Sequence, residues 1–166
     1  KMRKNPLTRA FRIDKLTLAA LEATLKLYLD EEAAIKEIPV LRMLTADTDE
    51  LSKKAKRLYH KLTKRLKDKC SISVVDDFSE VGGGSMPLHK LPTKAIAIAA
   101  DCISIDSLER KIRSYQTPVI ARISKDRLLL DVRTIFEEEM NIVTEALEWA
   151  LNGAVLRIAG ESEGTP

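Results

Sequence analysis

Four arginines have the type and spacing to bind an anion. Arg9 and Arg12 lie three residues apart, just ahead of a helical pattern. They would present two guanidinium forks to one anion if the turn between them is helical. Arg122 and Arg133 fall on the two strands of a predicted hairpin, where each could meet a carboxylate or a phosphate.

The same arginines also have structural interpretations. Arg9 and Arg12 can be ordinary surface cations beside a helix start, where a positive charge is mildly unfavourable to the helix dipole. Arg133 can pair with Asp131 or with a glutamate of the following helix, and Arg122 carries the same ambiguity. The residue types alone leave both interpretations open.

Metal and disulfide chemistry have little support in the sequence. Cys70 and Cys102 lie far apart without CxxC spacing, and His60 and His89 are the two histidines. Such scattered ligands do not predict a structural zinc site, so we expect no metal. We expect both cysteines to be free thiols that behave as small, buried apolar residues in a reducing cytosol.

Length and composition predict a globular chain. Its 166 residues, 45% hydrophobic and 32% charged, can form one core, or a small domain with an appended helix. The net charge of +3 is too small to indicate a polyanion partner unless the cations cluster. Because no apolar run approaches the roughly 20 residues that cross a bilayer, we expect a cytoplasmic protein without membrane contact.

The amino-terminal third is predicted to form a series of helices. Periodicity predicts a long helix over residues 14–29, with Asp14 as its cap. That helix is apolar around most of its circumference, so it must be covered on several sides, and we expect it between two domains or two subunits. A short helix over residues 31–37 ends ahead of Pro39, and a link over residues 40–46 follows.

A second long helix begins near Asp47 and has one apolar stripe and one basic side. The stripe contains leucines at intervals of three and four residues, from Leu51 to Leu66. A basic side usually faces solvent, but it could also bind a phosphate backbone, and both interpretations stay open. Its cations are Lys53, Lys54, Lys56, Arg57, Lys61, Lys64, Arg65 and Lys67.

From Cys70 onward the apolar period changes from helical to two, which predicts strands on both sides of a glycine loop. Gly82 to Gly84 predict a turn, because the loop matches neither the P-loop nor the dinucleotide-binding spacing. Gly153 should end the last helix. The expected elements after the loop are a helix over residues 105–115, strands over 119–124 and 127–134 joined at Lys125 and Asp126, and a helix over 137–151. This order predicts an α+β fold, with helices on one face of a mainly antiparallel sheet.

Four blocks in order along the chain resemble one family. They are NPLTRAFRIDKLTLAALEATL (5–25), IPVLRML (38–44), VGGGSMPLHKLP (81–92) and PVIARISKDRLLLDVRT (118–134). Together they resemble the bacterial selenocysteine synthases, the L-seryl-tRNA(Sec) selenium transferases. The resemblance covers nearly everything from Lys1 to about Leu151.

That resemblance implies the small carboxy-terminal domain of a fold-type I pyridoxal-phosphate enzyme. It divides the chain into the end of a large domain with an interdomain helix (1–46), a small α+β domain (47–153) and a disordered tail (154–166). In the family a lysine of the large domain holds the cofactor as a Schiff base, and that lysine is expected upstream of Lys1. The resemblance therefore assigns no catalytic residue to this chain, which should be inactive alone.

The family's chemistry, by the same resemblance, converts seryl-tRNA(Sec) to selenocysteinyl-tRNA(Sec). Selenophosphate donates the selenium and pyridoxal 5'-phosphate serves as electron sink. Arg9 and Arg12 match arginines that the family uses at its anion site, so the resemblance favours them as selenophosphate ligands. Arg133 and Arg122 are substrate-binding candidates, because fold-type I enzymes commonly hold a substrate carboxylate through a small-domain arginine near this point. The family also implies tRNA(Sec) as partner and a homo-oligomer.

Two other functions remain open from the sequence. One is a fragment of a related pyridoxal-phosphate lyase that acts on a phosphorylated sugar acid, since similar folds host different eliminations. The other is a stand-alone RNA-binding α+β module that uses the basic helix. Tyr59 is the only ring system near that basic run besides His60, which argues against base stacking.

Overall fold

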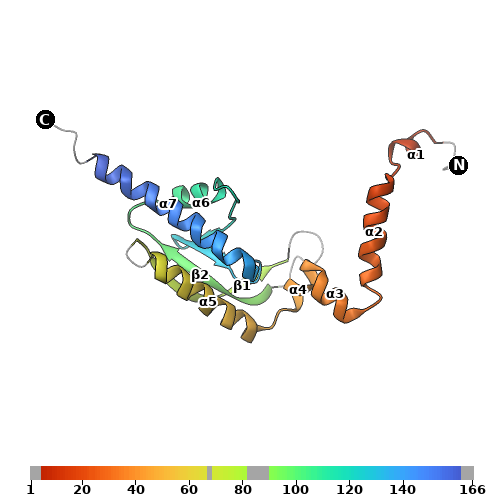
Figure 1. The fold of residues 1–166 in the computed structure, drawn as a ribbon, viewed down its shortest axis with the longest axis horizontal. Coiled ribbons are helices and arrows are strands. Elements are labelled where there is room, and N and C mark those ends of the chain that lie inside the picture. The colour runs from red at the N-terminus through yellow and green to blue at the C-terminus, as the bar shows by residue number, and fades with distance from the viewer. Residues whose placement is uncertain (1–4, 67–68, 82–89, 162–166) are drawn as a thin grey trace. The chain divides into compact units, whose positions relative to one another are not determined.

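A computed structural model describes residues 5–66, 69–81 and 90–161, although the side chains of residues 9–10 and 153–161 are not described. The chain divides into two compact units, Lys1–Thr45 and Ala46–Pro166. The first unit is helical and the second is α+β (Figure 1). The elements in chain order are α1 Leu7–Ala10, α2 Lys15–Leu27, α3 Glu31–Glu37, α4 Pro39–Thr45, α5 Thr48–Leu66, β1 Ser71–Glu80, β2 Lys90–Ala99, α6 Ile105–Arg113, β3 Arg122–Ser124, β4 Arg127–Asp131, the 3-10 turn η2 Glu137–Glu139 and α7 Met140–Glu161.

The α2 helix forms where the sequence predicts it, and Asp14 caps it. One Asp14 carboxylate oxygen accepts the backbone N–H groups of Leu16 (2.8 Å) and Thr17 (2.9 Å). These bonds satisfy two donors that the first helical turn leaves without partners. No residue of α2 is buried, and Leu16 is 83% exposed. The apolar side chains of α2 are therefore exposed, and the expected position of this helix between two domains or subunits stays a prediction.

A short helix, α4, replaces the predicted link over residues 40–46, so that prediction is wrong. Pro39 is its first residue, where the ring's fixed φ suits a helix and the missing N–H would have no partner anyway. Ile38 stays extended, as a residue before proline prefers, and its carbonyl accepts the N–H of Arg42 at 3.1 Å. Proline therefore begins a new helix here rather than opening a loop.

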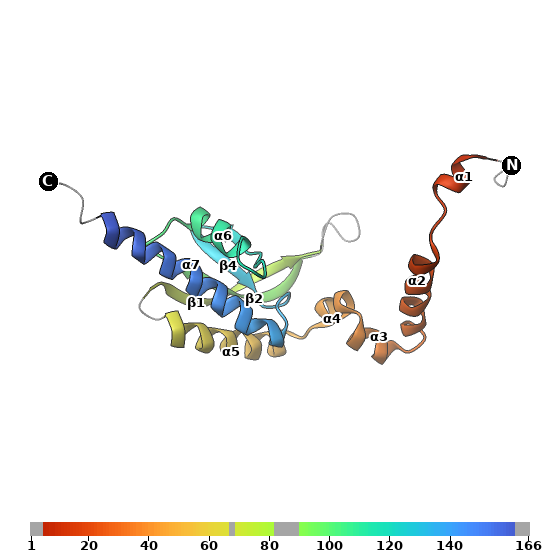
Figure 2. The ribbon, with the colours of Figure 1, turned by 45° about the horizontal axis from the view of Figure 1, so that its top comes forward.

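The second unit contains a four-stranded antiparallel sheet in the order β1-β2-β4-β3, which confirms the α+β prediction. Ile96 pairs with Leu130 and Ile98 with Leu128, so these four side chains share one face. They belong to the same core cluster as the apolar residues of α5, α6 and α7. The helices thus cover one face of the sheet, and α7 lies between α5 and α6 in both ribbon views (Figure 2).

The α5 helix contributes an unbroken buried stripe to this core. Apolar residues at intervals of three and four place about one side chain per turn against the sheet. The stripe consists of Leu51, Ala55, Leu58, Leu62 and Leu66, each at most 3% exposed. Its opposite side therefore faces away from the core.

The predicted hairpin is confirmed, with shorter strands than expected. Lys125 and Asp126 both have positive φ (50° and 58°), the pattern of a two-residue type I′ turn. The first strand begins only at Arg122, because the Val119 N–H bonds instead to the Ile112 carbonyl of α6 at 3.0 Å. The second strand ends at Asp131, whose carbonyl accepts the N–H of Thr134 in a turn (3.3 Å).

The last helix runs past Gly153 to Glu161, so the prediction that Gly153 ends it is wrong. A glycine inside a helix costs only about 1 kcal/mol relative to alanine. The six residues that follow it, AVLRIA, contain no helix breaker. Residues 154–161 are therefore helical in backbone rather than part of a tail, and residues 162–166 lie outside the described part.

Both cysteines are free, as expected. The Cys70 thiol lies within reach of the Leu66 carbonyl (3.8 Å) and that of Cys102 lies near the Lys69 carbonyl (3.9 Å). Burial raises the pKa of the Cys70 thiol to about 11, and the neighbouring Cys102 adds to the shift while Lys69 opposes it.

A pKa of about 11 predicts that the Cys70 thiol reacts slowly with alkylating agents. In the unmodified chain at pH 8, iodoacetamide should alkylate Cys70 about 100-fold more slowly than an ordinary exposed thiol, because the thiolate is the nucleophile. The rate should still rise about tenfold per pH unit up to pH 10, which mass spectrometry over time will measure. A rate that levels off near pH 9 would contradict the raised pKa.

Candidate functional site

The two amino-terminal arginines do not share one helical turn. Arg9 lies in α1, which ends at Ala10, and Arg12 lies in the link between α1 and α2. The helical turn that would align their guanidinium groups is therefore absent between Arg9 and Arg12. The Arg9 side chain is outside the described residues. The Arg12 side chain is exposed and makes no ion pair with the described part of the chain.

The link that carries Arg12 is anchored by Asp14. Besides the two backbone N–H groups, the Asp14 carboxylate accepts the Thr17 hydroxyl at 2.7 Å. The Thr17 hydroxyl is the main cause that lowers the pKa of Asp14 below its usual 3.8, and the Thr17 and Leu16 N–H groups add to it. The carboxylate thus stays ionised and fixes the direction in which the link enters α2.

Arg122 is held between two carboxylates on the sheet face that the helices leave open. Its guanidinium donates to Asp77 at 3.0 Å and to the Phe78 carbonyl at 3.3 Å, and it lies 3.5 Å from Asp131. Its side chain is 47% exposed. The positive charge is therefore largely balanced within the chain, although the group remains accessible.

Asp131 is the centre of a polar network at this end of the sheet. One of its oxygens accepts the Ser79 hydroxyl (2.6 Å), and the other accepts the Thr93 hydroxyl (2.8 Å) and the Arg133 backbone N–H (3.0 Å). Ser79 and Thr93 are both buried. The network joins β1, β2 and β4 at the point where the β1–β2 connection leaves the sheet.

Arg133 is buried, with 6% of its surface exposed. Its guanidinium donates to the Pro92 carbonyl at 2.6 Å and to the Ala46 carbonyl at 3.3 Å. Burial lowers the pKa of this guanidinium, and the nearby Asp131 opposes the shift. Two backbone contacts and burial favour the structural interpretation of Arg133 over a role in substrate binding.

Sequence reasoning missed the residues around Asp131. Ser79 and Thr93 sit at alternating strand positions that face away from the helices, where polar residues are ordinary. Only the register of three strands brings them to one carboxylate, so no spacing along the chain marks the network. The predicted glycine turn at Gly82 to Gly84, and His89 beyond it, lie outside the described residues.

Other site types find no support in residues 5–66, 69–81 and 90–161. Within these ranges no group of three or more His, Cys, Asp or Glu side chains could hold a metal ion. None of the helices described there is both long and apolar enough to span a membrane.

Comparison with known proteins decides the family. The model of the L-seryl-tRNA selenium transferase family matches residues 1–136. The chain belongs to this family. It is 51% identical over 148 residues to the L-seryl-tRNA(Sec) selenium transferase of Alkaliphilus metalliredigens, covering 89% of this chain and 32% of that protein. It is 49% identical over 145 residues to the enzyme of Clostridium botulinum strain Hall, covering 87% and 31%.

Membership of the selenium transferase family confirms the resemblance seen in the four sequence blocks. The chain spans about a third of the length of these relatives. The structure describes Arg9 and Arg12 in one unit and Arg122 and Arg133 in the other. The roles of these arginines therefore have to be argued from each unit by itself.

The Asp14 cap gives a first prediction. Replacing Thr17 by Val removes the hydroxyl and should raise the pKa of Asp14, whereas Thr17→Ser should keep it low. Because the folded pKa is depressed, the cap's contribution to stability is present above the unfolded pKa and is lost as the pH falls through the folded value. NMR titration of the Asp14 carboxyl carbon will measure these pKa values; an unchanged value in Thr17→Val would contradict this assignment.

The contrast between Arg133 and Arg122 gives a second prediction. Arg133→Met should lower the free energy of unfolding by about 1.5–3 kcal/mol, because it removes a buried charged donor and its part-buried hydrogen bonds to the Ala46 and Pro92 carbonyls. Arg122→Met should cost about 1 kcal/mol or less, since its ion pairs are half exposed. Urea denaturation of both variants measures the difference. Equal losses of unfolding free energy in the two variants would show that the Arg133 side chain does not stabilise this end of the sheet.

Proposed function

We propose that this chain is part of a pyridoxal-phosphate enzyme that transfers selenium to seryl-tRNA(Sec). The observation that carries the proposal is the identity of about one half, over nearly nine-tenths of the chain, to proteins named L-seryl-tRNA(Sec) selenium transferase. The match of 148 residues out of 166 reaches into both compact units. The related lyase acting on a phosphorylated sugar acid has no comparable support.

In this proposal the cofactor is held by a lysine that this chain does not supply. A Schiff-base lysine works in a desolvated pocket, which keeps its amine reactive. None of the lysines that the structure describes is buried. Pyridoxal 5'-phosphate would supply the electron sink, and the residues of this chain would bind and orient the other reactants.

Arg12, together with Arg9, is proposed to bind the phosphate group of a selenophosphate donor. An exposed guanidinium without an ion-pair partner in the described chain is free to form two parallel hydrogen bonds with phosphate oxygens. Asp14 fixes the start of α2 two residues further on. The link that carries Arg12 is thus fixed where it joins α2, which supports a role for Arg12 in positioning an anion.

Arg122 is proposed as a secondary contact for the substrate, and Arg133 as a positioning residue. Arg122 remains accessible although Asp77 and Asp131 hold it. Arg133 fixes the backbone at Ala46 and Pro92. The homo-oligomeric state and cytoplasmic location that the family implies belong to the same proposal, with tRNA(Sec) as the partner.

The anion role of Arg12 predicts a selective defect. In the full-length protein that carries this chain, Arg12→Gln should raise the KM for selenophosphate about 10- to 100-fold, the loss expected for one charged hydrogen-bonding group. Binding of seryl-tRNA(Sec) should stay unchanged, and Arg12→Lys should restore part of the loss. Steady-state selenium transfer with each substrate varied in turn measures both effects.

Lys36→Gln is the matched control, because Lys36 is another exposed cation in the same unit. It should leave the KM for selenophosphate as in the wild type. An Arg12→Gln enzyme with an unchanged KM for selenophosphate would rule out the anion role. A full-length wild-type protein that forms no selenocysteinyl-tRNA(Sec) from selenophosphate would overturn the proposed function as a whole.

A further inference from the structure

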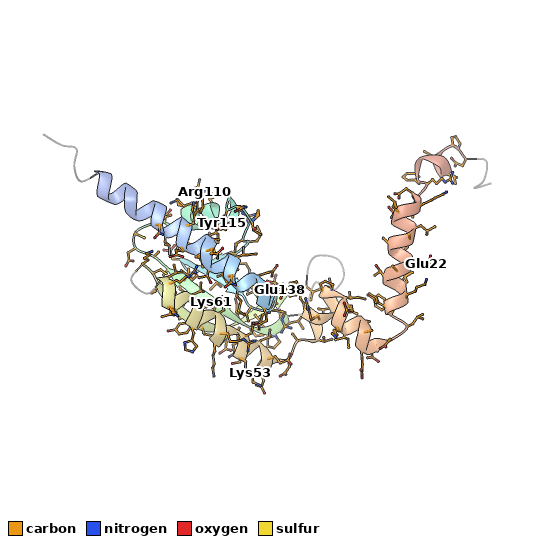
Figure 3. All side chains as sticks on the ribbon, viewed as in Figure 1. Glu22, Lys53, Lys61, Arg110, Tyr115 and Glu138 are labelled. Carbon is orange, nitrogen blue, oxygen red and sulfur yellow. The ribbon has the colours of Figure 1, made fainter. Side chains whose placement is uncertain are left out.

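The outward side of α5 carries a continuous row of cations, which we call the α5 basic stripe. The stripe lies opposite the buried leucines, because its members differ from them by about half a turn of the helix. Figure 3 labels Lys53 and Lys61 on this helix and Arg110 on α6. The stripe consists of Lys53, Lys56, Arg57, His60, Lys61 and Lys64, all exposed.

The charges of the stripe are mostly unbalanced. Arg57 forms an ion pair with Glu137 of η2, and Arg65 beside the stripe approaches Glu148 of α7 at 3.4 Å. The four lysines of the stripe make no ion pair with any residue that the structure describes. No aspartate or glutamate occurs between Leu51 and Leu66, since the acidic residues of α5 stand in its first turn.

This arrangement differs from that of an ordinary solvated helix side. Solvated helices commonly place opposite charges four residues apart, which stabilises them, whereas like charges at that spacing destabilise. Asp49 precedes Lys53 by four residues and Glu137 pairs with Arg57. Lys61 and Lys64, however, stand three residues apart with no acidic residue of α5 at either spacing, so they repel each other. The helix forms in spite of this repulsion because its other side is buried. A bound anion would relieve the repulsion.

The spacing of the stripe suits a polyanion rather than one small anion. Successive turns place a cation about every 5.4 Å, and Lys53 to Lys64 span about 16 Å along the axis. Tyr59 is half-buried and its ring lies edge-on to His60, 5.6 Å between centroids. His60 is thus the one exposed ring among the described residues of α5, so the stripe offers contacts to phosphates far more than base stacking.

We propose that the α5 basic stripe binds the phosphate backbone of the tRNA substrate. The identity of the RNA rests on the proposed function, whereas the charge pattern does not. Charge complementarity favours RNA over a second copy of this chain, because Glu137 and Glu148, the carboxylates that contact α5 from η2 and α7, are already paired with arginines. Such a contact would add affinity without reading sequence.

The test compares the salt dependence of tRNA binding. In the full-length protein, Lys53, Lys61 and Lys64 are replaced together by Gln, which keeps helix propensity. The dissociation constant for a tRNA(Sec) transcript is measured by fluorescence anisotropy at several salt concentrations. The slope of log affinity against log salt should fall by about 2 to 3, and binding at ~100 mM salt should weaken about tenfold or more. Circular dichroism should show the wild-type helix content.

A matched control removes the same charge elsewhere in the second unit. Lys90→Gln, Arg110→Gln and Lys125→Gln change three exposed cations outside α5. This variant should keep the wild-type slope. An equal loss of slope in both variants would show that only net charge matters and would overturn the proposal. An unchanged slope in the stripe variant would also overturn it.

Two further outcomes separate this proposal from its alternatives. Sedimentation without RNA should give the same oligomer for wild type and stripe variant; dissociation of the oligomer with unchanged tRNA binding would assign the stripe to a second copy and overturn the proposal. Selenium transfer by the stripe variant at saturating seryl-tRNA(Sec) should keep the wild-type kcat. If the wild-type protein performs the transfer but the stripe variant keeps the wild-type salt slope, the stripe does not bind tRNA. The proposed function is then unaffected.

Discussion

The burial of the α5 leucine stripe against one face of the sheet is the interaction on which the second unit depends. Leu58, Leu62 and Leu66 are fully buried, and they meet Ile96 and Ile98 of the central strand β2 in the core. Burial of each such side chain contributes about 1.5–3 kcal/mol. Because these residues fix the rotation of α5 about its own axis, they also determine which side of the helix faces outward. The direction of the basic side is thus a consequence of core packing.

A second constraint acts at the end of the sheet, where polar groups replace apolar packing. Asp131, the last residue of β4, accepts hydroxyls from β1 and β2 and the backbone N–H of Arg133, while the Arg133 side chain ties Pro92 of β2 to Ala46. Buried polar groups stabilise a fold only when their hydrogen bonds are made, so the members of this network depend on one another. The result is a defined end of the sheet, set by charge and hydrogen bonding rather than by side-chain volume. Arg122 can be held at the open face because Asp131 and Asp77 are already in place.

Periodicity along the sequence was sufficient to predict the helices and strands that carry a repeating apolar pattern, such as α5 and the β1–β2 pair. It failed where one residue decides the outcome. The helix over residues 31–37 ends ahead of Pro39 as predicted, but Pro39 begins α4 instead of a link, since its fixed φ suits a first helical position. Gly153 does not end α7, contrary to the prediction, because a single glycine destabilises a helix too little to end it when the residues that follow favour helix. The Asp131 network could not be predicted, because strand register alone brings its members together.

The candidate site was predictable only in part, and charge shows why. The net charge of +3 does not reveal the clustering of cations on α5, because acidic residues elsewhere in the chain balance them, whereas the periodic pattern of that helix does. Arg12 and the α5 basic stripe both offer positive charge, but they differ physically. Lysine ammonium groups on an exposed helix interact with phosphates across water, and salt screens that attraction over about 8 Å. A guanidinium that forms two parallel hydrogen bonds to one phosphate relies on direct contact and loses less to screening. Binding of a long polyanion and binding of a small phosphate donor should therefore respond differently to ionic strength, even though both depend on positive charge in the same chain.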